Sequence, residues 1–233
     1  AVLEHNADLG IAFDGDFDRC FLFNEKGEFI DGSYVVGMLA QAFLNKYPNE
    51  SIVYDPRVIY NTEAVINDHG GNAVISKSGH SFIKQVMRDS SAVYGGEMSA
   101  HHYFRDFFYC DSGMIPWLLT IELLSITGKT LSELVAGYIE AYPSSGELNF
   151  RLTTHDAPAI INAIEKNFSV QNPVKSTLDG LSLNFGEWRF NLRASNTEPL
   201  IRLNIESRGD RKLLDTKIQE INEWLAAQGA RPA

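Results

Sequence analysis

Three aspartates at alternate positions form the densest group of reactive side chains in the sequence. Asp14, Asp16 and Asp18 follow the short apolar run Gly10–Phe13, which predicts the buried end of a strand. Alternate residues of an extended chain point the same way, so the three carboxylates are expected to converge. Such close like charges repel one another unless a cation lies among them. Ligands that are all oxygen suit a hard ion, Mg²⁺ or Ca²⁺, rather than zinc.

Arg19 follows the aspartates directly and adds a guanidinium, the group that best matches a phosphate. The stretch therefore predicts a metal site that works on phosphate. Two alternatives remain open, a solvated Asp-rich turn and a phosphatase in which Asp14 is the covalent nucleophile. An EF-hand also begins with alternate aspartates, but Arg19 stands where its sharp turn needs glycine.

A second polar stretch, Gly95–His102, combines two glycines with a carboxylate, a hydroxyl and an imidazole. Glu97, Ser99 and His101 alternate, so their side chains are expected to face one way. These groups can both donate to and accept from vicinal sugar hydroxyls. The structural alternative is a polar turn with a core histidine.

A third stretch, Arg193–Pro199, lies between two expected strands. An arginine, hydroxyls, an amide and the backbone N–H groups of a turn can together form a nest for an anion. A plain hairpin turn explains the Ser, Asn and Pro of this stretch but explains Arg193 less well. Arg57, Lys77 and His80 are weaker candidates, because such single residues are more often surface charges or helix caps.

The composition is that of an ordinary globular chain with an acidic balance. The 233 residues carry a formal net charge of -10, with 44% apolar and 21% charged residues. This argues against binding to nucleic acid or to an anionic membrane. The spacing of Cys20 and Cys110 suits neither zinc nor a disulfide framework, and Cys20 is expected to be a buried small apolar residue. We therefore expect a cytoplasmic protein, with no segment apolar enough to span a bilayer.

The order of the elements predicts two kinds of sheet. Strands alternate with helices over residues 51–95, which indicates βαβ units. After a linker predicted at 142–146, consecutive strands near 181–206 indicate an antiparallel sheet, and the tail 229–233 is expected to fray. The expected fold class is α/β: a mixed, mostly parallel sheet domain with helices on both faces, followed by a smaller α+β domain with an antiparallel sheet.

With these stretches identified, the chain resembles the α-D-phosphohexomutase superfamily, most closely its bacterial phosphomannomutases. Residues Asp14–Arg19 resemble the metal loop of the family, Gly96–His101 its sugar-binding loop and Arg193–Pro199 its phosphate-binding loop. All three motifs occur in the order that the family has.

The resemblance implies an enzyme of four domains. Residues 1–27 would be the tail of domain 2, residues 28–142 domain 3, and residues 143–233 domain 4. The serine loop of the family, Thr-Ala-Ser-His-Asn-Pro, occurs nowhere in the sequence, and the chain does not begin with Met. We therefore expect a C-terminal portion that lacks its N-terminal half and is inactive alone.

The resemblance also implies the reaction, which interconverts mannose 6-phosphate and mannose 1-phosphate through a hexose 1,6-bisphosphate and a phosphoserine. Its implied partners are hexose phosphates of mannose or glucose and the missing N-terminal half, and its implied cofactor is Mg²⁺. The implied site consists of the metal ligands Asp14, Asp16 and Asp18, the catalytic residues Arg19, Arg57 and His80, the sugar ligands Glu97, Ser99 and His101, and the phosphate ligands Arg193, Ser195, Asn196 and Thr197. Two alternatives remain, a phosphoglucomutase or dual-specificity phosphohexomutase and a non-catalytic sugar-phosphate-binding protein.

Overall fold

The computed structural model describes residues 1–153, 156–195 and 198–233. The chain divides into a first unit of Ala1–Asp55 with Asn61–Ile139 and a second unit of Pro56–Tyr60 with Glu140–Ala233. The segment Pro56–Tyr60 thus belongs to the second unit, although the residues on either side of it belong to the first. The predicted division at residues 27 and 142 stays a prediction.

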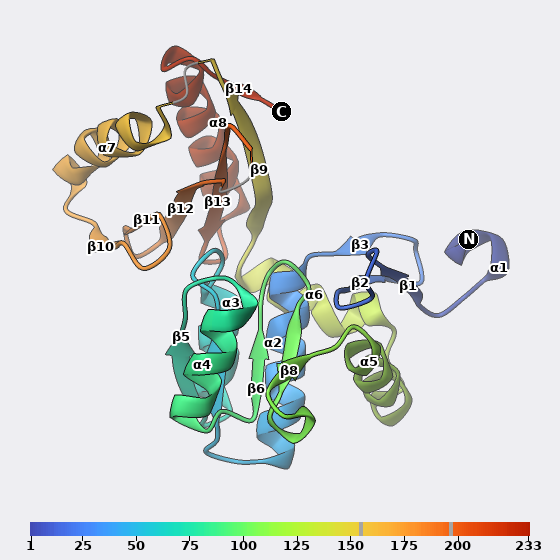
Figure 1. Cartoon of the computed structure of the whole chain (residues 1–233). Coiled ribbons are helices and arrows are strands. Elements are labelled where there is room, and N and C mark those ends of the chain that lie inside the picture. The colour runs from blue at the N-terminus through green and yellow to red at the C-terminus, as the bar shows by residue number, and fades with distance from the viewer. Residues whose placement is uncertain (154–155, 196–197) are drawn as a thin grey trace. The chain divides into compact units, whose positions relative to one another are not determined.

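A mixed five-stranded sheet forms the centre of the first unit (Figure 1), with strand order β5-β4-β6-β7-β8. β4 is parallel to β5 and β6, and β7 and β8 extend the sheet in antiparallel pairs. The strands are β4 (Ser51–Tyr54), β5 (Asn72–Ile75), β6 (Tyr94–Gly96), β7 (His102–Phe104) and β8 (Cys110–Asp111), and the helices that follow β4 and β5 are α3 (Tyr60–Asp68) and α4 (His80–Ser90). The predicted α/β class with a mixed sheet is confirmed, while the very short β7 and β8 were not predicted.

Two consecutive glycines in β6 allow helices to approach both faces of this sheet. A Cβ on Gly95 would lie 2.6 Å from Met87 Sδ in α4, and one on Gly96 would lie 2.6 Å from Val36 Cγ2. Val36 belongs to α2 (Gly32–Lys46), whose N-cap is Asp31. Neighbouring residues of a strand point to opposite faces, so α4 and α2 cover different faces, as predicted.

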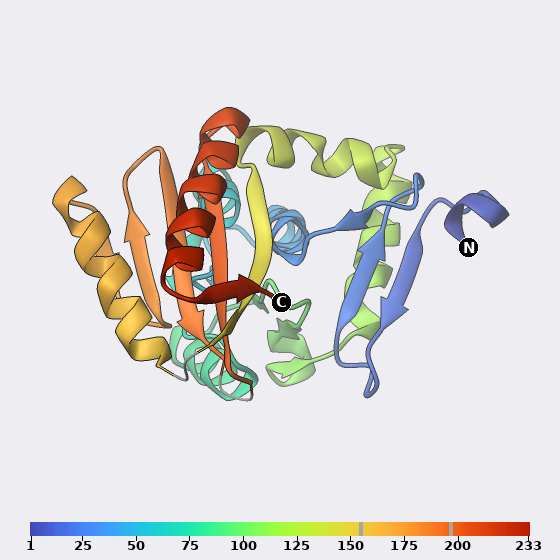
Figure 2. The same ribbon diagram turned by 90° about the horizontal axis from the view of Figure 1, so that it is seen from above.

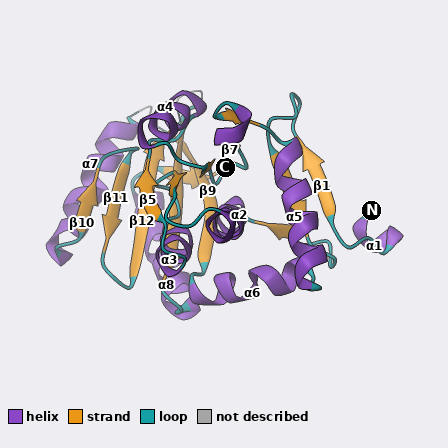
Figure 3. Ribbon diagram, turned by 90° about the horizontal axis from the view of Figure 1, so that it is seen from below, coloured by secondary structure: helices purple, strands orange, loops and turns teal. Residues whose placement is uncertain are grey.

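A small antiparallel sheet precedes the mixed one and is formed by β1 (Gly10–Phe13), β2 (Cys20–Phe23) and β3 (Phe29–Ile30). Helix α5 (Met114–Thr127) lies beside β2 (Figure 3) and is followed by α6 (Leu131–Ala141), and α1 (Val2–His5) begins the chain. The predicted strand at Gly10–Phe13 is confirmed as β1, but its predicted burial was wrong, because β1 is an edge strand in which Ile11 is 37% exposed. Cys20 is buried as predicted, and burial raises the pKa of its thiol to about 11.

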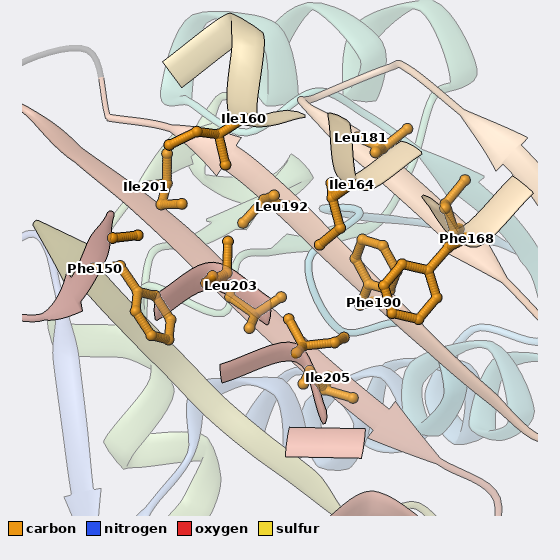
Figure 4. Close-up of a cluster of buried hydrophobic side chains, with 14 of the residues drawn as sticks. Phe150, Ile160, Ile164, Phe168, Leu181, Phe190, Leu192, Ile201, Leu203 and Ile205 are labelled. Atoms are coloured by element: carbon orange, nitrogen blue, oxygen red, sulfur yellow. The ribbon is translucent and has the colours of Figure 1, made fainter. Parts of the chain in front are cut away.

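The second unit is a six-stranded antiparallel sheet of order β10-β11-β12-β13-β9-β14, covered by two helices on one face (Figure 2). Its elements are β9 (Ser144–Leu152), α7 (Ala157–Phe168), β10 (Val174–Ser176), β11 (Leu181–Asn184), β12 (Trp188–Ala194), β13 (Leu200–Ser207), α8 (Arg211–Ala227) and β14 (Ala230–Pro232), and short 3-10 turns lie at Arg105–Phe107 (η1) and Ser169–Gln171 (η2). Ile164 and Phe168 of α7 pack with Phe190 and Leu203 of the sheet in one apolar core (Figure 4). The predicted antiparallel α+β class is confirmed.

Two details of the second unit differ from the prediction. The expected linker at 142–146 runs into β9, which begins at Ser144. The expected frayed tail forms β14, which pairs with β9 and buries Ala230 completely. In the part of the chain that is described, no helix is both long and apolar enough to cross a membrane.

Candidate functional site

The turn between β1 and β2 gathers the three aspartates. Single carboxylate oxygens of Asp14, Asp16 and Asp18 all lie within 4.8 Å of one another. The chain turns sharply at Phe17, whose φ is 62°, so the residues do not form one extended run. The carboxylates nevertheless converge, as the alternation predicts.

Arg19 neutralises the first of these carboxylates. Its Nε and Nη2 atoms both lie 2.6 Å from Asp14 Oδ2, and its backbone N–H donates to Asp14 Oδ1 at 3.2 Å. Partial removal from water acts to raise the pKa of Asp14, but the hydrogen bonds from Arg19 outweigh it and lower this pKa to about 2. Asp14 therefore stays ionised and is available to a cation only in competition with Arg19.

Asp18 has a different environment. Partial burial raises the pKa of Asp18, with His101 acting against the shift and the Asp14 and Asp16 carboxylates adding to it. Its Oδ1 atom is buried and has no hydrogen-bond partner among the described residues, the Arg19 Nε atom being 3.8 Å away. Oxygen ligands at this spacing, with one buried oxygen unsatisfied, fit a hard divalent cation.

A backbone bridge joins the acidic turn to the second predicted stretch. Arg19 and His101 pair as an isolated antiparallel bridge, and the N–H of Cys20 donates to the carbonyl of Ala100 at 3.3 Å. The side chains of the two stretches are also close, with 3.4 Å between His101 Nε2 and Asp18 Oδ2. The predicted metal loop and sugar loop therefore lie side by side in the first unit.

Glu97 is buried and held by hydrogen bonds from two sides. It is only 3% exposed, and its carboxylate accepts hydrogen bonds from the Gly79 N–H at 2.8 Å and the Tyr103 hydroxyl at 2.6 Å. The Met98 N–H donates to the buried Asp55 carboxylate at 2.7 Å, which fixes the same loop from another side. The loop is therefore held in one conformation by these hydrogen bonds without a bound ligand.

The remaining candidates of the first unit lie around this loop. Ser99 Oγ is 3.0 Å from His101 Nδ1, so these two side chains form a polar pair. His80 is exposed at the first position of α4, next to the Gly79 that Glu97 binds. Lys77 lies over the Phe82 ring at 5.1 Å. His80 therefore adjoins the loop, and its catalytic role stays a prediction.

The second unit holds a separate cluster of arginines around one carboxylate. Glu147 Oε2 lies 3.2 Å from Arg193 Nη2 and 3.9 Å from Arg57 Nη1, and Glu147 Oε1 lies 3.4 Å from Arg202 Nη1. We call these four residues the arginine cluster. Arg57 reaches it because Pro56–Tyr60 belongs to this unit. The structure thus groups Arg57 with Arg193.

Strand register explains the cluster. Arg193 in β12 lies directly opposite Arg202 in β13, and both face away from the apolar core. The Ser195 N–H donates to the Leu200 carbonyl at 2.8 Å and closes this hairpin. The predicted phosphate ligands Asn196 and Thr197 lie outside the described residues.

Sequence reasoning missed three residues of these arrangements, namely Tyr103, Glu147 and Arg202, whereas Asp55 lies in the stretch 55–57, which is expected at the carboxyl end of a strand. A signal existed for Arg202, because residues 188–193 and 201–206 alternate strictly between apolar and polar types. Alternation puts the polar residues of both strands on one face. For Tyr103 and Glu147 we find no such signal. Glu147 acts through contacts distant in the sequence, and Tyr103 meets Glu97 only because β6 and β7 pair as antiparallel strands.

The comparisons with known proteins agree with this architecture. Residues 31–142 match the family Phosphoglucomutase/phosphomannomutase, alpha/beta/alpha domain III, and residues 147–223 match its C-terminal domain. The chain is 58% identical over 225 residues to a phosphomannomutase of Salmonella montevideo, covering 97% of this chain and 49% of that protein. It is 56% identical to phosphohexose mutases of Xanthomonas campestris pv. campestris (strain B100), covering 97% and 50% respectively.

The fold of the chain is also similar to that of solved structures from this family. A crystal structure of a phosphoglucomutase/phosphomannomutase family protein from Burkholderia thailandensis superposes with a TM-score of 0.82 at 26% identity. The match covers 99% of this chain and 49% of that one. The chain thus spans about half the length of the curated relatives it matches. With two successive domains matched and more than half of the residues identical to those of its relatives, the chain belongs to the phosphoglucomutase/phosphomannomutase family.

Proposed function

We propose that this chain is the C-terminal portion of a phosphomannomutase that interconverts mannose 6-phosphate and mannose 1-phosphate. The observation that carries the proposal is the backbone bridge between Arg19 and His101. It holds a set of carboxylates suited to a metal ion beside a loop suited to sugar hydroxyls. A reaction that moves a phosphoryl group on a sugar needs these two capacities at one place.

In the proposed reaction, a phosphoserine outside this chain donates its phosphoryl group to the free hydroxyl of a hexose phosphate. The resulting 1,6-bisphosphate turns around and returns its other phosphoryl group to the serine. Asp14, Asp16 and Asp18 would hold Mg²⁺, which offsets negative charge on the transferring group. Arg19 lies beside them and would contact the same phosphoryl oxygens, and His80 adjoins the loop from α4.

The sugar would bind at the adjoining loop, and the phosphate that is not reacting would bind in the second unit. Glu97, Ser99 and His101 present carboxylate, hydroxyl and imidazole groups to the ring hydroxyls. Arg193 and Ser195, together with Asn196 and Thr197, would hold the second phosphate. Arg57 supports this role electrostatically, because arginine does not lose its proton in proteins.

A phosphohexomutase that accepts both mannose and glucose phosphates is the second candidate. The 56% identity to phosphohexose mutases of Xanthomonas favours it. Glu97 and Ser99 can bind hydroxyls that the two sugars share, so the loop does not select between them. For either candidate we place the reaction in the cytoplasm, because both Cys20 and Cys110 are free thiols.

A coupled assay tests the proposal. The complete enzyme, supplied with mannose 1-phosphate, hexose 1,6-bisphosphate and Mg²⁺, is expected to form mannose 6-phosphate. This chain alone is expected to give no turnover, because the serine loop is absent from its sequence. Turnover by the chain alone that is lost in Asp14→Asn would instead indicate an aspartyl-phosphate enzyme. An inactive complete enzyme that still binds hexose phosphate would indicate a binding protein.

A further inference from the structure

Glu147 occupies the position in the arginine cluster where an anionic ligand would be expected to bind. The distances from its carboxylate oxygens to the nearest guanidinium nitrogens of Arg57, Arg193 and Arg202 are 3.9, 3.2 and 3.4 Å. A charge-assisted hydrogen bond between a guanidinium and a carboxylate is usually about 2.7–2.9 Å long. Arg193 Nη2 donates a hydrogen bond to Glu147 Oε2 at 3.2 Å, and the distances to Arg202 and Arg57 are longer, so none of the three contacts is as short as such a bond usually is.

The cluster is also left with unsatisfied donors. The Nε atoms of Arg193 and Arg202 are buried and have no hydrogen-bond partner among the described residues. Three guanidinium groups surround one carboxylate, so these four residues keep an excess of two positive charges. A phosphate monoester carries about that much negative charge at neutral pH.

The backbone that carries each of the three arginines is fixed by strand pairing or by buried hydrogen bonds. The segment that carries Arg57 is held by the buried side chains of Arg189 and Glu206. Arg193 and Arg202 are directly paired in neighbouring strands. Glu147 lies in β9, which pairs with β13, so its backbone is fixed as well, and a ligand can replace its carboxylate only if the side chain, which is 24% exposed, rotates away.

We propose that Glu147 is an internal competitor for phosphate, which limits how tightly the arginine cluster holds its ligand. The inference rests on the proposed function, in which the bisphosphate must leave this site in order to turn around. Three arginines without a counter-charge would bind both ends of the intermediate too tightly for rapid exchange. A carboxylate that returns to the arginines as the phosphate leaves lowers the affinity and favours release.

Anion binding by this chain provides the first test. Inorganic phosphate is titrated at pH 8 into wild type and Glu147→Gln by calorimetry at low ionic strength. Glu147→Gln is expected to bind phosphate at least about tenfold more tightly, because a like charge a few ångströms from the ligand is removed. Glu187→Gln makes the same charge change in the turn at the other end of β12 and is expected to match wild type. Equal or weaker phosphate binding by folded Glu147→Gln would refute the proposal.

A second variant covers the case in which Glu147→Gln does not fold. Glu147→Asp withdraws the carboxylate from the arginines by one methylene group, so it is expected to bind phosphate more tightly than wild type. Binding equal to or weaker than that of wild type would contradict the proposal. Circular dichroism checks the fold of each variant.

Kinetics of the complete enzyme provide the second test. Glu147→Gln is expected to lower both KM and kcat for mannose 1-phosphate, because tighter binding of the ground state slows release. A merely structural role would lower kcat without lowering KM, and that outcome would refute the proposal. The calorimetric result does not depend on mutase activity, so an inactive wild-type enzyme would contradict the proposed function alone.

Discussion

Arg189 and Glu206 form a buried ion pair, with 2.6 Å between Nη1 and Oε1, and both side chains are at most 2% exposed. Arg189 also donates to the carbonyls of Pro56 and Arg57 at 2.7 and 3.0 Å. Glu206 accepts from the N–H groups of Ile59 and Tyr60 at 2.8 and 2.9 Å. The pair thus ties a distant segment of the chain to the second unit and fixes the backbone of Arg57.

Glu206→Gln is expected to destabilise the protein by about 3–5 kcal/mol, since breaking a buried pair leaves a buried charge uncompensated. The NH₂ group of the glutamine side chain would in addition face a backbone N–H donor, that of Ile59 or of Tyr60, in place of an acceptor oxygen. Urea unfolding measures the loss. Glu165→Gln, which breaks the exposed ion pair with Lys175, is the control and is expected to cost at most about 1 kcal/mol. Equal losses in the two variants would contradict this role of Glu206.

His102 is expected to make stability depend on pH. The residue is fully buried, and burial together with the charge of His101 lowers the pKa of His102 to about 3 from its usual 6.5. Its Nδ1 lies 2.6 Å from the Tyr94 hydroxyl. Between these two pKa values the unfolded state binds a proton that the folded state does not, so stability falls as the pH falls. The contribution lost between pH 7 and pH 5 is about 2 kcal/mol.

His102→Gln removes this titration. Its free energy of unfolding is expected to fall by about 2 kcal/mol less than that of wild type between pH 7 and pH 5. The measurement is urea unfolding at both pH values. His5→Gln, at an exposed position, is the control and should retain the pH dependence of wild type. An unchanged dependence in His102→Gln would show that another group is responsible.

Asp16→Asn is expected to weaken Mg²⁺ binding by about tenfold, because one of three converging carboxylates loses its charge. Calorimetric titration of this chain measures the difference. Absolute affinity should be modest, since Arg19 already engages Asp14. Asp8→Asn makes the same change at an exposed position outside the turn. Indistinguishable curves for Asp16→Asn and wild type would argue against a metal at these residues.

Glu97→Gln in the complete enzyme is expected to lower kcat/KM about ten- to a hundredfold for every hexose phosphate that it accepts. The amide cannot accept from both Gly79 and Tyr103 with its two ends, and it lacks the charge that we propose binds a sugar hydroxyl. Tyr103→Phe keeps the charge but removes one hydrogen bond, so a loss of only about fivefold is expected. Glu122→Gln, on an exposed position of α5, serves as the control. If Glu97→Gln does not change the kinetics, the role of Glu97 is purely structural.

Much of the fold follows from local patterns in the sequence. The helices α2, α4, α7 and α8 and the strands β11, β12 and β13 lie within a few residues of their predicted ranges, because apolar periodicity, caps and turn residues are local properties. The convergence of Asp14, Asp16 and Asp18 is local as well. The strands β7, β8 and β14 were missed, since strands this short exist only through their pairing partners.

Only the tertiary structure shows which contacts fix Arg57 and bring the arginine cluster together. Nothing near Arg57 in the sequence indicates that its segment leaves the first unit, because the anchor consists of Arg189 and Glu206, more than a hundred residues later. Glu147 likewise meets its arginines only through the pairing of three strands. A sequence pattern shows which groups are available and which way they face. Which charges compensate one another depends on contacts between residues far apart in the chain, and these form only when the chain folds.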